Sequence, residues 1–375
     1  MPKPLVVCVV GTRPDAIKSA PVIRELRRFE DRVDTLVVAT GQHREMLAQA
    51  LAAFDLTADV DLDIMTHGQT LAQVTTRALE GLDRVLAERS PQLVLAQGDT
   101  STTFAAALAA FYRRIPFGHV EAGLRTPTID DPFPEEFNRR AAALVATQHY
   151  APTKWSAENL RQEGVPEDHI FVTGNTGIDA VQYTATRSKT VWLPDHTGPV
   201  ILVTTHRREN WGEPQRRIAE AIRTILADNP TAVAVVAMHR NPDVRTTLTK
   251  VLGDCPQVQL IEPPDYAPFV RLMQRADLIL SDSGGVQEEA PAFGKPVLVL
   301  RETTERPEGV SAGVARLVGT DRERIIAEAN ELLSHPSAYA AMARATSPYG
   351  DGRASQRIRH AALQLLGVDS PAELE

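Results

Sequence analysis

The sequence predicts two α/β domains, each a doubly wound parallel sheet of the Rossmann-like kind. Short apolar runs rich in β-branched residues alternate with longer amphipathic stretches along the whole chain, which is typical of repeated strand–helix units. The runs are continuously apolar, as parallel strands buried on both faces are expected to be. With 375 residues, the chain is also longer than one ordinary core requires.

Strands are expected at ten of these runs, namely residues 5–10, 35–40, 93–97, 117–120, 170–173, 200–204, 232–237, 257–261, 278–281 and 296–300. The stretches between them have helical periodicity. In residues 69–89, for example, Leu71, Val74, Ala78 and Leu82 lie on one stripe. A last helix is expected near residues 352–366.

The domain division is expected where this alternation is interrupted. Periodicity lapses and proline and glycine cluster in residues 187–199, after which the pattern restarts with a strand. We assign residues 1–174 to an N-terminal domain and 175–352 to a C-terminal domain, and expect a helix at about 353–375 to pack back on the first. Ligands are expected outside the carboxyl ends of the strands, in the cleft between the domains.

Composition narrows the classes of partner. The net charge of −8 disfavours nucleic acid and anionic membrane, so an anionic ligand must be met by local positive groups. No signal-peptide pattern and no run of about 18 apolar residues is found, and we expect a cytoplasmic protein. Of the two cysteines, Cys8 lies in an apolar run and is expected to be buried and inert.

The strongest phosphate signal lies in LILSDSGGVQEEA, residues 278–290. A strand is expected to end at Ser281 and a helix to start near Val286, so that the free N–H groups of a Ser-Gly-Gly turn face an anion. Glu289, one turn into that helix, could accept hydrogen bonds from ribose hydroxyls. The alternative is an ordinary helix start capped by Ser283 or Asp282.

Cations follow the first strand in GTRPDAIK, residues 11–18, which is not a P-loop. Ile17 stands where the second glycine is needed, and Pro14 removes an N–H group. Arg13 and Lys18 beside a helix N-terminus oppose the helix dipole, so we expect them to meet an anion. The alternative is that both are solvated surface charges.

Acidic residues follow other strand ends or open helices. Asp99 and Glu121 each come directly after a strand and its turn, and Glu135 opens a helix with Arg139 one turn later. The structural alternatives are that Asp99 caps the next helix and that Glu135 pairs with Arg139 on the surface.

His206, followed by two arginines, ends another strand and could contact a diphosphate or protonate a leaving oxygen. Neither metal-ligand spacing nor a nicotinamide-binding fingerprint is present, so we expect no metal and no cofactor.

Together these motifs resemble those of the non-hydrolysing UDP-N-acetylglucosamine 2-epimerases, over nearly the whole chain. The matching segments are GTRPDAIKSAPV, GQHREML, GDTSTT, GHVEAGLRT, PFPEEFNRR, TGNTGIDA, THRREN, residues 281–310 and SPYGDG. The resemblance implies a GT-B-like fold with the active site in the interdomain cleft, and a homodimer. It also implies interconversion of UDP-GlcNAc and UDP-ManNAc for cell-surface polysaccharide biosynthesis, without a metal or nicotinamide.

The resemblance further implies roles for single residues. The expected nucleotide site comprises Arg13, Phe269, Ser283, Gly284, Gly285, Glu289 and Arg306. The expected catalytic group comprises Lys18, Asp99, Glu121, Glu135, Arg139 and His206. Gln42 and His43 match part of an allosteric site that some relatives have. An arginine also belongs to that site, and this chain has Gly68 near the corresponding position. The chain also carries Pro264 and Thr205 where relatives often carry glutamine and glycine.

Inversion at carbon 2 explains why such a site needs both cations and acids. No carbonyl group stabilises a carbanion there, so a carboxylate with a pKa of about 4 cannot remove the proton directly. Expulsion of UDP from carbon 1 makes the proton acidic, and its loss gives 2-acetamidoglucal, to which UDP adds again after reprotonation. We hypothesise Asp99 as the base, with Glu121 or Glu135 serving the opposite face.

Other readings stay open on the sequence. A GT-B glycosyltransferase shares the architecture and the diphosphate site but needs no acids on both faces of carbon 2. A binding module, a hydrolysing relative that releases ManNAc, and a 2-epimerase of another UDP-2-acetamido sugar are the remaining alternatives.

Overall fold

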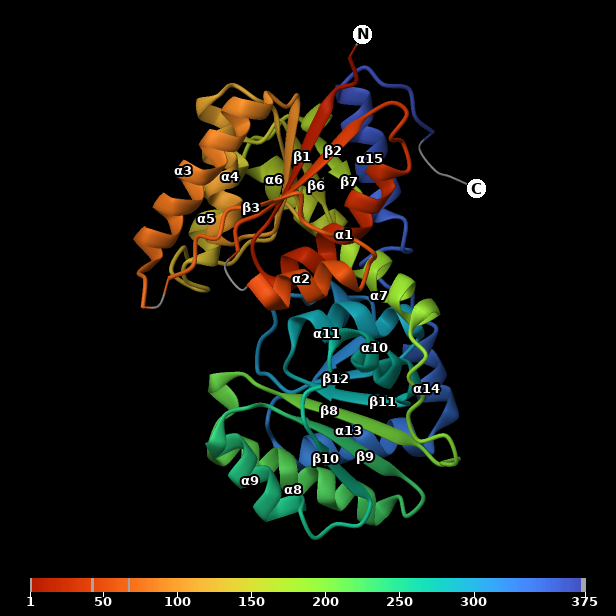
Figure 1. Ribbon diagram of the computed structural model, residues 1–375. Coiled ribbons are helices and arrows are strands. Elements are labelled where there is room, and N and C mark those ends of the chain that lie inside the picture. Colours follow the sequence, from red (N-terminus) through yellow and green to blue (C-terminus); the bar gives the residue numbers. More distant parts are fainter. Residues whose placement is uncertain (1, 42–43, 67, 372–375) are drawn as a thin grey trace. The chain divides into compact units, whose positions relative to one another are not determined.

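The computed structural model describes residues 2–41, 44–66 and 68–371 (Figure 1). It contains two compact units, residues 1–180 with 349–375, and residues 181–348. The chain passes from the first unit to the second inside one helix, α7 (Thr176–Arg187). Val181 and Ala185 of that helix pack into the core of the second unit.

The first unit is built on a seven-stranded sheet in the order β3-β2-β1-β4-β5-β6-β7, in which every neighbouring pair is parallel. Its strands are β1 (Leu5–Val10), β2 (Asp34–Ala39), β3 (Val60–Asp61), β4 (Leu93–Gln97), β5 (Phe117–Val120), β6 (Gln148–Ala151) and β7 (Ile170–Val172).

Helices cover both faces of this sheet. They are α1 (Arg13–Arg27), α2 (Arg44–Ala52), α3 (Leu71–Arg89), α4 (Ser101–Tyr112), α5 (Glu135–Val145), α6 (Lys154–Gln162), the short η1 (Glu167–His169) and α15 (Ala354–Leu365). Alternate residues of β1 point to opposite faces: Val7 and Val9 pack with α3 and α4, whereas Cys8 lies beside Val22 and Ile23 of α1.

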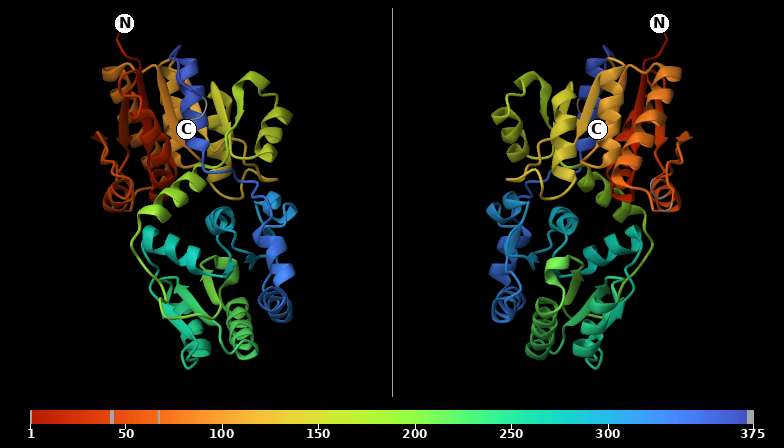
Figure 2. Two further views of the ribbon diagram at one scale, coloured as in Figure 1. Left: turned by 90° about the vertical axis from the view of Figure 1, so that its right-hand side faces the viewer. Right: turned by 90° about the vertical axis from the view of Figure 1, so that its left-hand side faces the viewer.

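The last helix of the chain, α15, packs on α1, the first helix. Figures 1 and 2 show it, in blue, within the first unit. Arg359 is fully buried in this contact, with its guanidinium carbon 4.5 Å from the ring centre of Phe29 and its Nε 3.5 Å from Oε2 of Glu25. The contact therefore combines a cation–π interaction with a buried ion pair.

The second unit is built on a six-stranded parallel sheet in the order β10-β9-β8-β11-β12-β13. Its strands are β8 (Val200–Thr205), β9 (Val233–Met238), β10 (Val258–Ile261), β11 (Leu278–Ser281), β12 (Val297–Val299) and β13 (Ala315–Leu317). Its helices are η2 (Arg208–Asn210), α8 (Glu213–Asp228), α9 (Pro242–Leu252), α10 (Tyr266–Arg275), α11 (Gly284–Glu289), η3 (Ala290–Phe293), α12 (Pro307–Ser311), α13 (Arg322–Ser334) and α14 (Pro336–Ala343).

The predicted fold class, two doubly wound parallel-sheet domains, is confirmed, while some element bounds differ. The helix after β11 begins at Gly284, not near Val286. Three short strands escaped prediction: β3, β6 and β13. Among the described residues, no helix is long and apolar enough to cross a membrane.

Candidate active site

In each sheet the strand order reverses at one point, and the loops there carry the candidate residues. The reversal lies between β1 and β4 in the first sheet and between β8 and β11 in the second. The carboxyl ends of neighbouring parallel strands meet at one edge, so the loops that follow them converge. These loops carry Asp99 in the first unit and His206 and Ser283 in the second, and Arg13 begins the helix that follows β1.

Glu121 directly follows β5 and is held by two donors. Lys18, in the second turn of α1, forms an ion pair with Oε1 of Glu121. Nε2 of Gln97, the last residue of β4, donates to Oε2 at 2.9 Å. The backbone φ of Glu121 is +63°, in the left-handed region that is costly for a non-glycine residue. Two donors therefore fix the Glu121 carboxylate, and its backbone has a conformation that a residue other than glycine rarely adopts.

Asp99 lies in the turn after β4 and pairs with α5. Nη2 of Arg139 forms an ion pair with Oδ2 of Asp99, and Nδ2 of Asn138 donates to the Asp99 carbonyl at 3.0 Å. Within the part of the chain that the structure describes, Oδ1 of Asp99 accepts no hydrogen bond. The alternative that Asp99 caps α4 is wrong, because the cap is Thr100, whose Oγ1 accepts from the Thr103 N–H at 3.3 Å.

Glu135 and Glu136 are the first two residues of α5. The sequence suggested that Glu135 pairs with Arg139, but Glu136 does so. Glu136 is fully buried and accepts from Nη1 of Arg139 at 3.1 Å and from Nε of Arg140 at 2.6 Å. Glu135 is half-buried, and its side chain pairs with no other described residue. The surface pair between Glu135 and Arg139 is therefore wrong. Sequence reasoning missed Glu136, although its spacing to the two arginines also fits a helix.

Asp15 is a further buried carboxyl close to this group that sequence reasoning passed over. Its Oδ2 accepts from the Thr12 N–H and from Oγ1 of Thr100, each at 3.2 Å, which closes the capping box of α1. Burial raises the pKa of Asp15 to about 7, and the charge of Asp99 adds to the rise, while hydrogen bonds from Thr12 oppose it. Asp15 therefore titrates near neutral pH beside a candidate acid.

His119 holds the turn that carries Asp99. Its Nε2 lies 2.7 Å from the carbonyl oxygen of Gly98, and the ring is fully buried. Burial lowers the pKa of His119 to about 4, outweighing the opposite effect of the hydrogen bond to Gly98. The ring is thus neutral at pH 7, with the hydrogen on Nε2, which donates to the carbonyl.

In the second unit, Asp282 after β11 orients His206 after β8. Nδ1 of His206 lies 2.9 Å from Oδ1 of Asp282, and the N–H groups of His206 and Arg207 and Nδ2 of Asn210 donate to the same carboxylate. Burial raises the pKa of Asp282, but the interactions with His206 and Arg207 outweigh it and lower the pKa below its usual value. An ionised Asp282 fixes the Nδ1–H form of His206, so Nε2 is left to meet a ligand.

Gly284 permits close contact between α11 and Arg306. A Cβ atom at this position would lie 2.7 Å from Cζ of Arg306. The guanidinium is held by Glu288, 2.8 Å from Nε to Oε1, and by Glu305, 3.1 Å from Nη1 to Oε2. The cation thus lies on the first turn of α11, whose N–H groups lack partners within the helix. Ser283 occupies the cap position without a side-chain cap, and Asp282, bound to the β8 loop, does not cap the helix.

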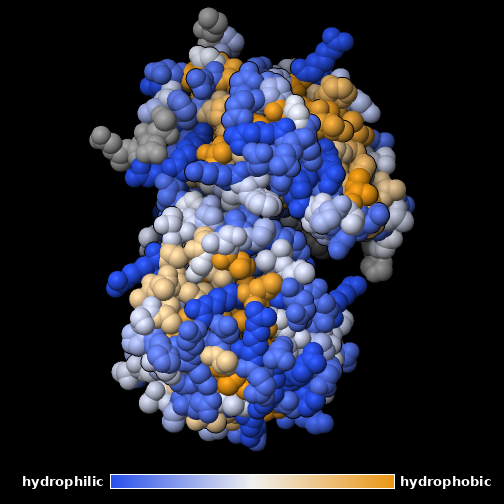
Figure 3. All heavy atoms as spheres, turned by 180° about the vertical axis from the view of Figure 1, so that it is seen from behind, coloured by the Kyte–Doolittle hydropathy of each residue, from blue (hydrophilic) through white to orange (hydrophobic). Residues whose placement is uncertain are grey.

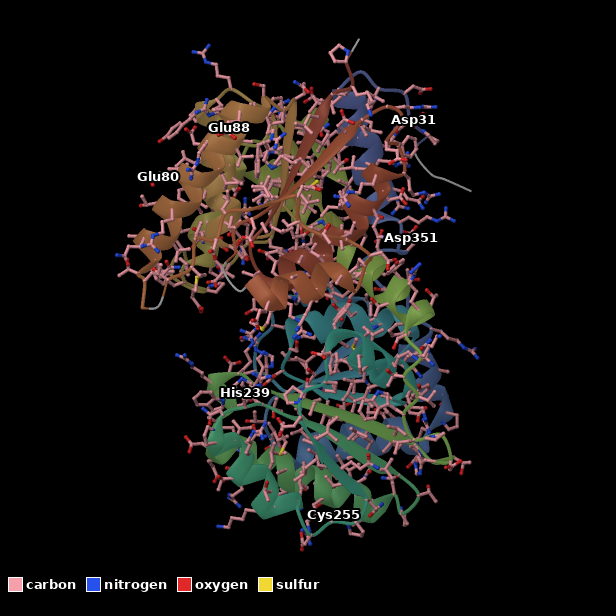
Figure 4. All side chains as sticks on the ribbon, in the orientation of Figure 1. Asp31, Glu80, Glu88, His239, Cys255 and Asp351 are labelled. Atoms are coloured by element: carbon pink, nitrogen blue, oxygen red, sulfur yellow. The ribbon has the colours of Figure 1, made fainter. Side chains whose placement is uncertain are left out.

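A pocket of about 240 Å³ opens beside His206. Ser283, Phe269, Pro264 and His239 are among its lining residues, and the ring centres of His206 and His239 are 6.4 Å apart. Figure 4 labels His239, which directly follows β9 and was not singled out from the sequence. A pocket walled by an aromatic ring and proline suits a planar ligand group.

The remaining predicted residues are placed as follows. Arg13 is the first residue of α1 and is half-buried. Glu289 is the last residue of α11. Burial raises the pKa of Tyr266, and the negative charge of Glu289 adds to this rise. Gln42 and His43 lie outside the described residues. Within residues 2–41, 44–66 and 68–371, no group of three or more histidine, cysteine, aspartate or glutamate side chains could hold a metal ion.

The protein has two parallel-sheet units, and in each the candidate residues lie at the point where the strand order reverses. This architecture is that of the GT-B-like fold class. A family model described as UDP-N-acetylglucosamine 2-epimerase matches residues 24–363, and the chain belongs to that family.

Named relatives agree. The chain is 49% identical over 367 residues to the UDP-N-acetylglucosamine 2-epimerase of Salmonella typhimurium, covering 95% of this chain and 97% of the relative. It is 49% identical over 360 residues to that of Bacillus subtilis, covering 96% and 94%. A crystal structure of UDP-GlcNAc 2-epimerase from Neisseria meningitidis bound to UDP-GlcNAc is similar, with a TM-score of 0.87, 46% identity, and coverage of 96% of this chain and 100% of that one.

Proposed function

We propose that this chain is a UDP-N-acetylglucosamine 2-epimerase, an isomerase that interconverts UDP-GlcNAc and UDP-ManNAc. The observation that carries the proposal is the pair of ion pairs at the strand ends of the first unit, Lys18 with Glu121 and Arg139 with Asp99. They supply acids that can exchange protons and cations that balance their charge. Membership of the family supports the substrate.

The reaction is an elimination followed by an addition. The bond between carbon 1 and the phosphate oxygen breaks with its electron pair going to UDP, while a carboxylate takes the proton from carbon 2. A double bond between the two carbons results, as 2-acetamidoglucal. A proton is then delivered to carbon 2 from the opposite face, and UDP adds back at carbon 1. No net oxidation occurs, which is consistent with an isomerase.

The leaving diphosphate is assigned to groups of the second unit, together with Arg13. Arg306, the N–H groups at Gly284 and Gly285, and His206 through Nε2 are suited to stabilise negative charge that grows as UDP departs. The pocket beside Phe269 is assigned to the uracil. These assignments follow the family motifs and are supported by the Arg306–Gly284 contact and by the Asp282–His206 pair.

Asp99 is our candidate for the base at carbon 2. One of its oxygens is bound by Arg139 while Oδ1 accepts no hydrogen bond from a described residue, and its side chain is 26% exposed. Both oxygens of Glu121, by contrast, accept from Lys18 and Gln97. We assign Glu121 or Glu135 to the opposite face.

The test is to incubate the full chain with UDP-GlcNAc in deuterated water and to follow the sugar by NMR. The proposal expects UDP-ManNAc that carries deuterium at carbon 2. Free ManNAc would instead indicate a hydrolase. No change without an added acceptor would indicate a glycosyltransferase, a binding module or a different UDP-2-acetamido sugar.

We further propose that the enzyme is a cytoplasmic homodimer that serves cell-surface polysaccharide biosynthesis. Support for the dimer comes from an apolar face that α4 and α5 expose, which we call the α4–α5 face. It comprises Phe104, Leu108, Phe111, Phe137, Ala141 and Leu144, spaced three or four residues apart along each helix. Phe104 packs edge-on against Phe137, with ring centres 5.6 Å apart.

Three side chains of the α4–α5 face are strongly exposed: Phe111 by 57%, Phe137 by 46% and Leu144 by 87%. In Figure 3 an orange band lies at the right-hand edge, on the side of α4 and α5. A contiguous exposed apolar patch of this kind is typical of an interface, and a second copy with the same face can cover it.

A further inference from the structure

We propose that Gln97 is a positioning residue for Glu121, and that Thr176 fixes Gln97 in the orientation that this requires. The inference rests on the proposed function, in which Glu121 is one of the acids that serve carbon 2. Neither Gln97 nor Thr176 is expected to touch the substrate. Both act through the Glu121 carboxylate.

The geometry is a chain of three side chains, of which Gln97 and Thr176 are buried and Glu121 is partly buried. Gln97, 2% exposed, ends β4, and its Nε2 donates to Oε2 of Glu121 at 2.9 Å. Its Oε1 accepts from Oγ1 of Thr176 at 3.3 Å. Thr176 is also 2% exposed and is the first residue of α7. Because the amide oxygen faces the hydroxyl of Thr176, the NH₂ group faces the carboxylate.

These hydrogen bonds fix the orientation of the Glu121 carboxylate. With Lys18 on Oε1 and Gln97 on Oε2, the carboxylate cannot turn without breaking both contacts. Its own backbone, at φ +63°, does not favour the observed conformation. Gln97 therefore fixes the side of Glu121 away from Lys18, and small displacements of a reacting group are costly in rate.

The test uses two near-isosteric variants. Gln97→Met removes both hydrogen bonds at similar volume, and Thr176→Val removes only the hydroxyl. We expect kcat to fall about 10–100-fold in the first and less in the second, with KM changed by less than about threefold. The double variant should be no slower than Gln97→Met, because both residues act through one chain.

The matched control is Thr40→Val, which removes a fully buried hydroxyl that pairs with Oγ1 of Thr102 at 3.0 Å and has no part in the Glu121 chain. Its kcat should equal that of the wild type. The inference is overturned if Gln97→Met retains the wild-type kcat, or loses no more kcat than the control. An inactive wild type overturns the proposed function as well. An active wild type with an unaffected Gln97→Met overturns only this inference.

Discussion

Three candidate acids of the first unit differ in what holds them. Glu121 is bound at both oxygens, Asp99 at one, and Glu135 by no described side chain. A carboxylate with an unoccupied oxygen beside a bound one is both positioned and able to accept a proton. This is why we assign the base at carbon 2 to Asp99.

Replacing Asp99 by asparagine removes the base but keeps the size and one hydrogen-bond acceptor. We expect Asp99→Asn to lower kcat by about 10²–10⁴-fold and to abolish deuterium incorporation at carbon 2. UDP affinity should change little, because the diphosphate is assigned to other groups. NMR in deuterated water and calorimetric titration with UDP measure the two effects.

Asp31→Asn is the matched control for this variant. Asp31 is an exposed aspartate, labelled in Figure 4, whose partner is Arg32. Its substitution should leave both measurements at the wild-type values. Deuterium exchange that persists in Asp99→Asn would assign the base to another residue.

Asp15 gives a pH prediction. Its pKa is about 7 in the folded protein against an ordinary 3.8, so between these values the folded state holds a proton that the unfolded state has lost. The free energy of unfolding therefore falls as pH rises through this window. Asparagine does not titrate, so the stability of Asp15→Asn relative to the wild type should rise by roughly 2–3 kcal/mol from pH 5 to pH 8.

Urea unfolding at the two pH values measures this difference. The Asp31→Asn variant should show a difference from the wild type that is the same at both. A pH-independent difference for Asp15→Asn would mean that the buried carboxyl does not titrate in this window.

At the scale of single residues, the sequence identified candidate site residues more reliably than the residues that pair with them. It singled out Asp99, Glu121 and His206 because each follows a predicted strand. It could not show that Arg139 pairs with Asp99, or that Asp282 binds His206, since these partners lie 40 and 76 residues apart. Such pairings follow from sheet order, which periodicity does not give.

At the scale of elements, continuous apolar runs predicted the strands that carry the site. The strand β6 was missed because it begins with Gln148 and His149, which are buried but polar. Nε2 of Gln148 donates to the carbonyl of Ala361 in α15 at 3.0 Å, and Oε1 of Gln148 pairs with the hydroxyl of Tyr150. Only tertiary contacts make such a strand stable, so local pattern could not reveal it.

The short helix α11 gives a prediction about ligand binding. In Gly284→Ala the new methyl group would lie 2.7 Å from Cζ of Arg306, and the guanidinium must move. We expect UDP affinity to fall about tenfold, which corresponds to about 1.4 kcal/mol, with the fold retained. Calorimetry measures the affinity.

Arg306→Ala supplies the comparison for this variant. Because both changes act on one cation, Gly284→Ala combined with Arg306→Ala should bind UDP no more weakly than Arg306→Ala alone. Additive losses would show that Gly284 acts independently of Arg306.

At the scale of the whole molecule, length and alternation predicted two α/β units. The sequence pattern suggested a boundary around residues 187–199, and we assigned the domains to meet at residues 174 and 175, whereas the two compact units divide inside α7, between Ala180 and Val181. A helix that serves two cores has no break in periodicity, so the sequence gives no signal at the crossing.

The α4–α5 face tests the proposed dimer. Leu144→Glu places a charge on the most exposed apolar side chain of that face. Burial of this charge in a self-complementary interface would be costly, so we expect the wild type to be dimeric and the variant monomeric. Light scattering after size-exclusion chromatography gives both masses, and a monomeric wild type would contradict the proposal.

The proposed mechanism requires that UDP leaves carbon 1 before carbon 2 is reprotonated. The most direct measurement uses UDP-GlcNAc carrying ¹⁸O in the oxygen that bridges the sugar and the phosphate, followed by ³¹P NMR during turnover. Because freed UDP can rotate its terminal phosphate, we expect the label to spread to the non-bridging positions. Epimerisation with the label still in the bridge would contradict it.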